Sequence, residues 1–71
     1  MFSSTEVVVQ ATRTLQSTHP ALRHLRVQGA EGSLVISGTV TCYYHKQLAQ
    51  EALKPLRGDL ELVNHVKVST N

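Results

Sequence analysis

Residues 32–40 of the chain read Gly-Ser-Leu-Val-Ile-Ser-Gly-Thr-Val. From Leu34 onward every second residue is apolar or glycine, which is the period of a β-strand, because successive side chains of a strand point to opposite faces. Leu34, Ile36, Gly38 and Val40 are therefore expected on a buried face. The residues between them are expected on the opposite, more polar face.

The residues that precede this strand predict the other half of a β-hairpin. Leu25 and Val27 are apolar and alternate with polar residues over 24–28. Glu31 and Gly32 then fit a tight turn, since glycine adopts a positive φ at little cost. We therefore expect 24–28 and 33–40 to pair as antiparallel strands.

A second helix and a third strand are predicted after residue 41. Apolar residues recur at helical spacing over 42–56, and Pro55 is expected to tighten or end the last turn because it lacks an N–H group. Gly58 then fits a left-handed cap. Residues 60–68 alternate once more, with Leu62, Asn64 and Val66 on one face, and predict a strand.

The start of the chain predicts a first helix that ends near Ser17. Ser3 and Glu6 have the spacing of a capping box, and Phe2 and Val7 have the spacing of a hydrophobic staple. The helix should end before the proline at position 20, because the residue that precedes a proline avoids the helical region.

The expected order is helix, strand, strand, helix, strand, which belongs to the α+β class. We expect a single αββαβ domain over 1–71, with two helices packed on one face of a mixed three-stranded sheet and the other face open to water. The predicted core consists of Val7, Val8, Ala11, Leu15, Leu25, Val27, Leu34, Ile36, Val40, Leu48, Ala49, Ala52, Leu56, Leu62, Val66 and Val68.

The composition is that of one small folded domain with a weak positive charge. The 71 residues are 41% hydrophobic and 17% charged, and the net charge is +2 with neutral histidines. This charge is too small for a dedicated nucleic-acid binder, and we predict no nucleic-acid partner. Residues 29–32 match the GXXG letters of a KH domain, but they lie in the predicted hairpin and include a glutamate.

Two glycine-containing signatures stand on either side of the second helix. The first consists of Gly32, Leu34, Ile36, Gly38 and Val40, and the second consists of Gly58, Leu62, Asn64, Val66 and Val68. Ala49 supplies a small core residue in the helix between them. In this pattern and spacing the sequence resembles the BON domain family, which is named for bacterial osmotic-shock and nodulation proteins.

The resemblance implies a non-enzymatic binding module that contacts phospholipid membrane surfaces. It also implies a periplasmic or envelope-associated location if these residues belong to a longer exported protein. Taken as complete, the chain has no apolar run long enough for a signal peptide or a transmembrane segment, and is expected in the cytoplasm. A protein–protein interaction module that uses the open sheet face or a sheet edge is the alternative. The sequence does not indicate an oligomeric state.

Two residues of these signatures have expected roles in the fold. We expect Gly38 to let the second helix approach the sheet closely. Asn64 faces the core, where an unpaired amide is costly, so we expect it to hydrogen-bond the backbone of a neighbouring loop.

Catalytic and metal chemistry have few candidates in this chain. Cys42 and His45 would lie on one helix face as a nucleophile and a base, but that face is the edge of the core and no third orienting residue is evident. His24 and His65 fall on the outer strands, about 10 Å apart, which is too far to share a metal ion. We therefore predict no enzyme activity, no cofactor and no metal site.

The open sheet face is the candidate binding surface. We expect it to engage an anionic surface such as phospholipid, or a protein partner, and to bind more strongly as histidines gain charge at lower pH. Its candidate residues are His24, Arg26, Val35, Val63, His65 and Lys67.

Overall fold

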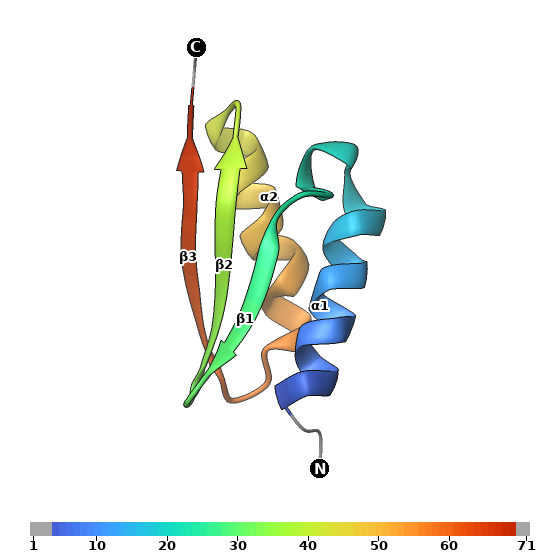
Figure 1. Ribbon diagram of the computed structural model, residues 1–71, viewed down its shortest axis with the longest axis vertical. Helices are drawn as coiled ribbons and strands as arrows, with labels where there is room; N and C mark the ends of the chain where they lie inside the picture. The colour runs from blue at the N-terminus through green and yellow to red at the C-terminus, as the bar shows by residue number, and fades with distance from the viewer. Residues whose placement is uncertain (1–3, 70–71) are drawn as a thin grey trace.

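A computed structural model describes residues 4–69 of the chain (Figure 1). The elements in chain order are α1 (Ser4–Thr18), the 3-10 turn η1 (Pro20–Leu22), β1 (Arg26–Ala30), β2 (Ser33–Val40), α2 (Tyr43–Leu53), the 3-10 turn η2 (Lys54–Leu56) and β3 (Glu61–Val68). The expected Ser3 cap and Phe2 staple lie outside the described residues.

The three strands form one mixed sheet in the order β1-β2-β3. β1 pairs antiparallel with β2, and β3 pairs parallel with β2 after the crossover through α2. Both helices lie on the same side of the sheet, while the opposite side is uncovered (Figure 1). The predicted αββαβ fold is therefore confirmed.

The hairpin between β1 and β2 closes through the predicted two-residue turn. Ala30 pairs with Ser33, which leaves Glu31 and Gly32 as the loop, and Gly32 has a φ of 72°. A left-handed residue at this point turns the chain with the twist of the two strands, and glycine adopts that conformation without a steric penalty.

The end of α2 follows the predicted effect of its proline. The α-helix stops at Leu53 and continues as η2, which contains Pro55. A proline N–H is not available for the helical hydrogen bond, so a tighter 3-10 turn finishes the segment. Gly58 then reverses the chain with a φ of 55°, as expected.

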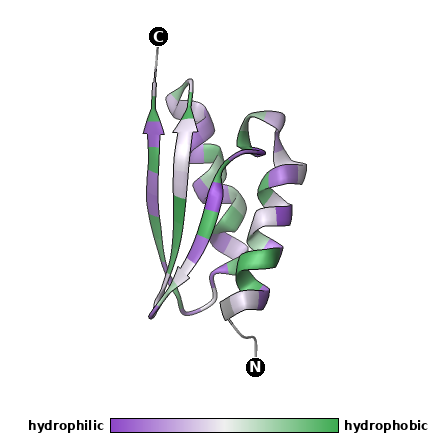
Figure 2. Ribbon diagram, viewed as in Figure 1, coloured by the Kyte–Doolittle hydropathy of each residue, from purple (hydrophilic) through white to green (hydrophobic). Residues whose placement is uncertain are grey.

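The core lies between the helices and the inner face of the sheet, where apolar and polar residues alternate along the strands (Figure 2). Two fully buried residues, Leu22 and Leu53, were absent from the predicted core. Seven predicted core residues are only half-buried and pack around the buried cluster, because the helices cover this small sheet incompletely. These are Val7, Val8, Leu48, Ala52, Leu56, Leu62 and Val68.

The expected role of Gly38 was wrong. A Cβ atom added to Gly38 would lie 2.6 Å from Leu25 Cδ2 and 3.4 Å from Leu25 Cα, so the close neighbour belongs to the segment that enters β1 and not to α2. The reason is the register: Arg26 pairs with Ser37, which places Leu25 across from Gly38. The φ of Gly38 is 132°, which a residue with a side chain rarely adopts.

The partner expected for Asn64 was also wrong in one respect. Its Nδ2 donates to the Lys46 carbonyl oxygen at 3.1 Å and to Gln50 Oε1 at 3.3 Å, so it bonds α2 and not a loop. Its Oδ1 accepts the N–H of Val66 at 3.0 Å. Because β3 packs against α2, the helix offers the nearest acceptors, and both polar atoms of the Asn64 amide are hydrogen-bonded.

Candidate functional site

The uncovered face of the sheet carries four cross-strand rows of side chains. The strand register aligns Arg26 with Ser37 and Ser37 with His65 in one row, and it places Val35 directly beside Val63 in the next. Thr39 pairs with Lys67 toward one end of the sheet, and Ser33 pairs with Glu61 at the other end. Residues that are scattered along the sequence are thus brought onto one continuous surface.

The charges on this face are not evenly spread. Arg26, His65 and Lys67 are exposed and occupy the two rows nearest the start of α2. Val35 and Val63 are half-buried and form an apolar pair in the middle of the face. The face therefore has a basic half that leads into an apolar centre. Its carboxylate, Glu61, stands beyond that centre.

His24 lies elsewhere than the sequence indicated. It precedes β1, in the turn after η1, and its Nε2 is 2.7 Å from the carbonyl oxygen of Thr39. A carbonyl oxygen only accepts, so the histidine ring donates this hydrogen bond. The ring thereby closes the β1–β2 pair at its open end and does not stand on the strand face, since the ladder begins only at Arg26.

A thiol and an imidazole are in contact at the start of α2. Cys42 is the residue that precedes the helix, and its Sγ is 3.2 Å from His45 Nδ1. Both residues are half-buried, as expected for the edge of the core. The His45 ring also packs against the His19 ring, with 4.7 Å between the ring centroids, a contact that the sequence analysis missed.

His19 is held by a bond of its own. Its Nδ1 accepts the N–H of Ala21 at 3.0 Å and so caps the 3-10 turn η1. This nitrogen must therefore carry no hydrogen, which defines the His19 tautomer. Because the acceptor of the cap is used, His19 offers only its Nε2 side to other groups.

The described residues, 4–69, contain no group of three His, Cys, Asp or Glu side chains arranged to hold a metal ion. Cys42, His45 and His19 form a contact cluster. Within it, Cys42 Sγ and His45 Nδ1 are hydrogen-bonded to each other, and His19 Nδ1 caps η1. The arrangement is that of a structural junction between η1 and α2.

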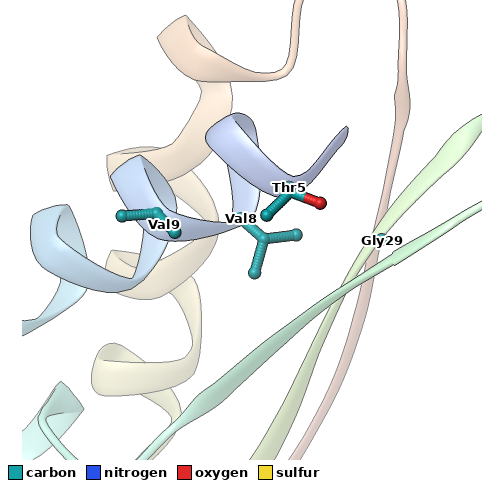
Figure 3. A pocket seen from close by; sticks show the side chains of 4 residues that line it. All are labelled: Thr5, Val8, Val9 and Gly29. Atoms are coloured by element: carbon teal, nitrogen blue, oxygen red, sulfur yellow. The ribbon is translucent and has the colours of Figure 1, made fainter. Parts of the chain in front are cut away.

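Two shallow hollows lie along α1. One, of about 200 Å³, is lined by Thr5, Val8, Val9 and Gly29, where the start of α1 passes the end of β1 (Figure 3). The other, of about 280 Å³, lies on the outer side of α1 beside Arg13. Both are smaller than the pockets that enclose a small-molecule ligand, and the first offers one hydroxyl as its polar side chain.

No family model matches the chain, and no curated protein matches it. Within residues 4–69, neither helix combines the length and the apolar character that crossing a bilayer requires.

Proposed function

We propose that this chain is a non-enzymatic binding module of the BON type that contacts anionic phospholipid surfaces through its open sheet face. One observation carries the proposal: a face that no helix covers combines positive charge with an apolar centre. Arg26 and His65 share one cross-strand row, Lys67 stands in the neighbouring row, and the Val35–Val63 pair lies on the other side of that first row. Clustered cations attract an anionic headgroup layer, and an apolar centre adds contact area once the surfaces meet.

The BON assignment is supported by what its signature residues do in this fold. Gly32 and Gly58 adopt left-handed turns, and Gly38 makes room for Leu25. Ala49 is fully buried against the sheet, and Asn64 joins β3 to α2. Each of these residues shapes the fold and none is a reactive group, which suits a binding module better than an enzyme.

The Cys42–His45 contact has no part in the proposed function. Both side chains are half-buried, and neither hollow along α1 is lined by them. A thiol nucleophile needs space for a substrate carbonyl and donors for the developing oxyanion beside it.

Cosedimentation with lipid vesicles tests the proposal. We expect the protein to bind vesicles that contain phosphatidylglycerol at pH 6 and low salt, and to bind weakly to pure phosphatidylcholine. Replacing Arg26 and Lys67 by Gln should weaken binding about fivefold for each charge removed. The matched control is Glu61→Gln on the same face, which should strengthen binding.

Two results would overturn the proposal. One is equal binding to anionic and zwitterionic vesicles, because it removes the electrostatic cause. The other is an unchanged affinity in the Arg26→Gln, Lys67→Gln variant, because it removes the sheet face from the lipid contact and favours a protein partner for that face.

A further inference from the structure

Charged side chains are segregated along the long axis of the domain. All strands and both helices run along this axis, so each element has one end at each pole (Figure 1). The chain has five carboxylate side chains, and all of them belong to the pole where α1 begins and α2 ends. They are Glu6, Glu31, Glu51, Asp59 and Glu61.

The cations at that carboxylate pole are engaged locally. Lys54 Nζ lies 2.8 Å from Glu51 Oε2, and Arg57 Nη1 donates to the Leu60 carbonyl oxygen at 3.0 Å. The two cations neutralise only part of the charge of the five carboxylates, so this pole has a net negative charge.

The opposite pole has the reverse character. It is formed by η1 and the turn after it, by the start of β1, by the start of α2 and by the ends of β2 and β3. Contacts between these segments hold them together. All five carboxylate side chains lie at the other pole, so no Asp or Glu side chain balances the cations of this pole. These cations are Arg23, Arg26, Lys46 and Lys67, with His19, His24 and His45 beside them.

The two tyrosines of the chain lie at the same basic pole. Tyr43 and Tyr44 are the first two residues of α2, and they are 63% and 65% exposed. They are the most exposed of the large apolar or aromatic side chains in the described residues. The Tyr44 ring contacts the His45 ring, with 5.8 Å between the centroids, yet most of each tyrosine side chain faces solvent, and a partner surface is a physical reason to expose them at this pole.

We propose that the domain docks on an anionic bilayer with this basic pole foremost and the basic half of the open sheet face tilted toward the lipid, so that the rings of Tyr43 and Tyr44 lie at the level of the headgroups. The inference rests on the proposed function, since it names the part of the domain that enters the lipid. A tyrosine ring has an apolar body and a polar hydroxyl, which is why tyrosine is enriched at membrane interfaces. Lys46, Lys67 and Arg23 belong to the same pole, and their positive charge pairs with lipid phosphates.

The dimensions of the pole favour a bilayer over a protein partner. The domain measures 21 by 16 Å across its long axis, so its end offers much less than the roughly 800 Å² per partner that a stable protein interface buries. A charged membrane needs no such area, because each cation near its surface gains attraction separately.

Intrinsic tyrosine fluorescence tests this orientation directly. The chain has no tryptophan, so the emission comes from Tyr43 and Tyr44 alone. We expect acrylamide to quench this emission less when the protein is bound to phosphatidylglycerol vesicles at pH 6 than when it is free. Quenching that is equally efficient for vesicle-bound and free protein overturns the pole-first orientation, while the proposed function stands.

A matched pair of lysines on one segment provides the second test. Lys46→Gln removes a charge from the basic pole, and Lys54→Gln removes one from the carboxylate pole. We expect the first to weaken vesicle binding about fivefold and the second to change it less than twofold. Equal effects of the two variants overturn the proposal. If the wild-type protein does not bind anionic vesicles at low salt, the proposed function and the pole-first orientation both fail.

Discussion

Asn64 of β3 donates a hydrogen bond to the backbone carbonyl of Lys46 in α2 at 3.1 Å, and this bond ties the last strand to the helix that precedes it. The same side chain accepts the N–H of Val66 at 3.0 Å. Because β3 lies at the edge of the sheet, an N–H group that is capped in this way is not available to pair with another chain.

Replacing Asn64 by Ala should lower the free energy of unfolding by about 1–3 kcal/mol, since it leaves the Lys46 carbonyl and the Val66 N–H without their partner. Urea unfolding followed by circular dichroism measures this difference. The neighbouring exposed residue provides the control, because His65→Ala should change stability by less than about 0.5 kcal/mol. Equal effects of both substitutions would contradict the role given to Asn64.

The register of β2 predicts a strong contrast between adjacent residues. Ile36 is fully buried, whereas Val35 is half-buried on the open face. Ile36→Ala should lower the free energy of unfolding by about 2–5 kcal/mol, a loss as large as the whole stability of many small domains. Val35→Ala should lower it much less. Thermal unfolding of the two variants checks the register. If Val35→Ala were the more damaging change, the strand would be facing the other way.

The two left-handed glycines of the hairpin should respond differently to alanine. Gly32 has no heavy atom within 4 Å of an added Cβ, so Gly32→Ala has only the backbone penalty of about 1–2 kcal/mol. Gly38→Ala should cost more, because its Cβ would also overlap Leu25 at 2.6 Å. Chemical denaturation gives both values. A Gly38→Ala variant as stable as Gly32→Ala would show that the chain at Leu25 moves aside freely.

The bond between His19 and Ala21 stabilises the turn that follows α1. The Nδ1 of His19 accepts the Ala21 N–H and so caps η1. His19→Ala removes this acceptor and should lower the free energy of unfolding by about 0.5–2 kcal/mol, whereas His19→Asn, whose side-chain oxygen can cap the turn, should cost less. Chemical denaturation of the two variants compares these values. Equal losses in both variants would exclude the cap as the cause.

The alternation of side chains explains why the strands were predictable. In 33–40 and 60–68 a period of two residues assigns every side chain to a face, and the assignment of Val35 and Val63 to the open face followed from it. Glu31 and Gly32 were predictable for the same local reason, since a turn of this type needs a residue that adopts a positive φ.

The features that sequence reasoning missed all depend on contacts between distant segments. Leu22 stands alone in a short 3-10 turn, where no periodicity indicates burial. Leu25 lies close to Gly38 because the register of β1 and β2 continues one residue beyond the Arg26–Ser37 pair. The contact between His19 and His45, and the separation of charge between the two poles, arise only when the helices and strands are stacked along one axis.

An NMR titration of ¹⁵N-labelled protein with anionic phospholipid bicelles at pH 6 and low salt decides whether the open sheet face binds lipid. We expect the amide signals of Ser37, His65 and Lys67 on β2 and β3 to shift as lipid is added, and the shifts to shrink when salt is raised, because screening acts over about 8–10 Å. If the signals of β2 and β3 stay in place while lipid is added, the open sheet face is not the lipid-binding surface.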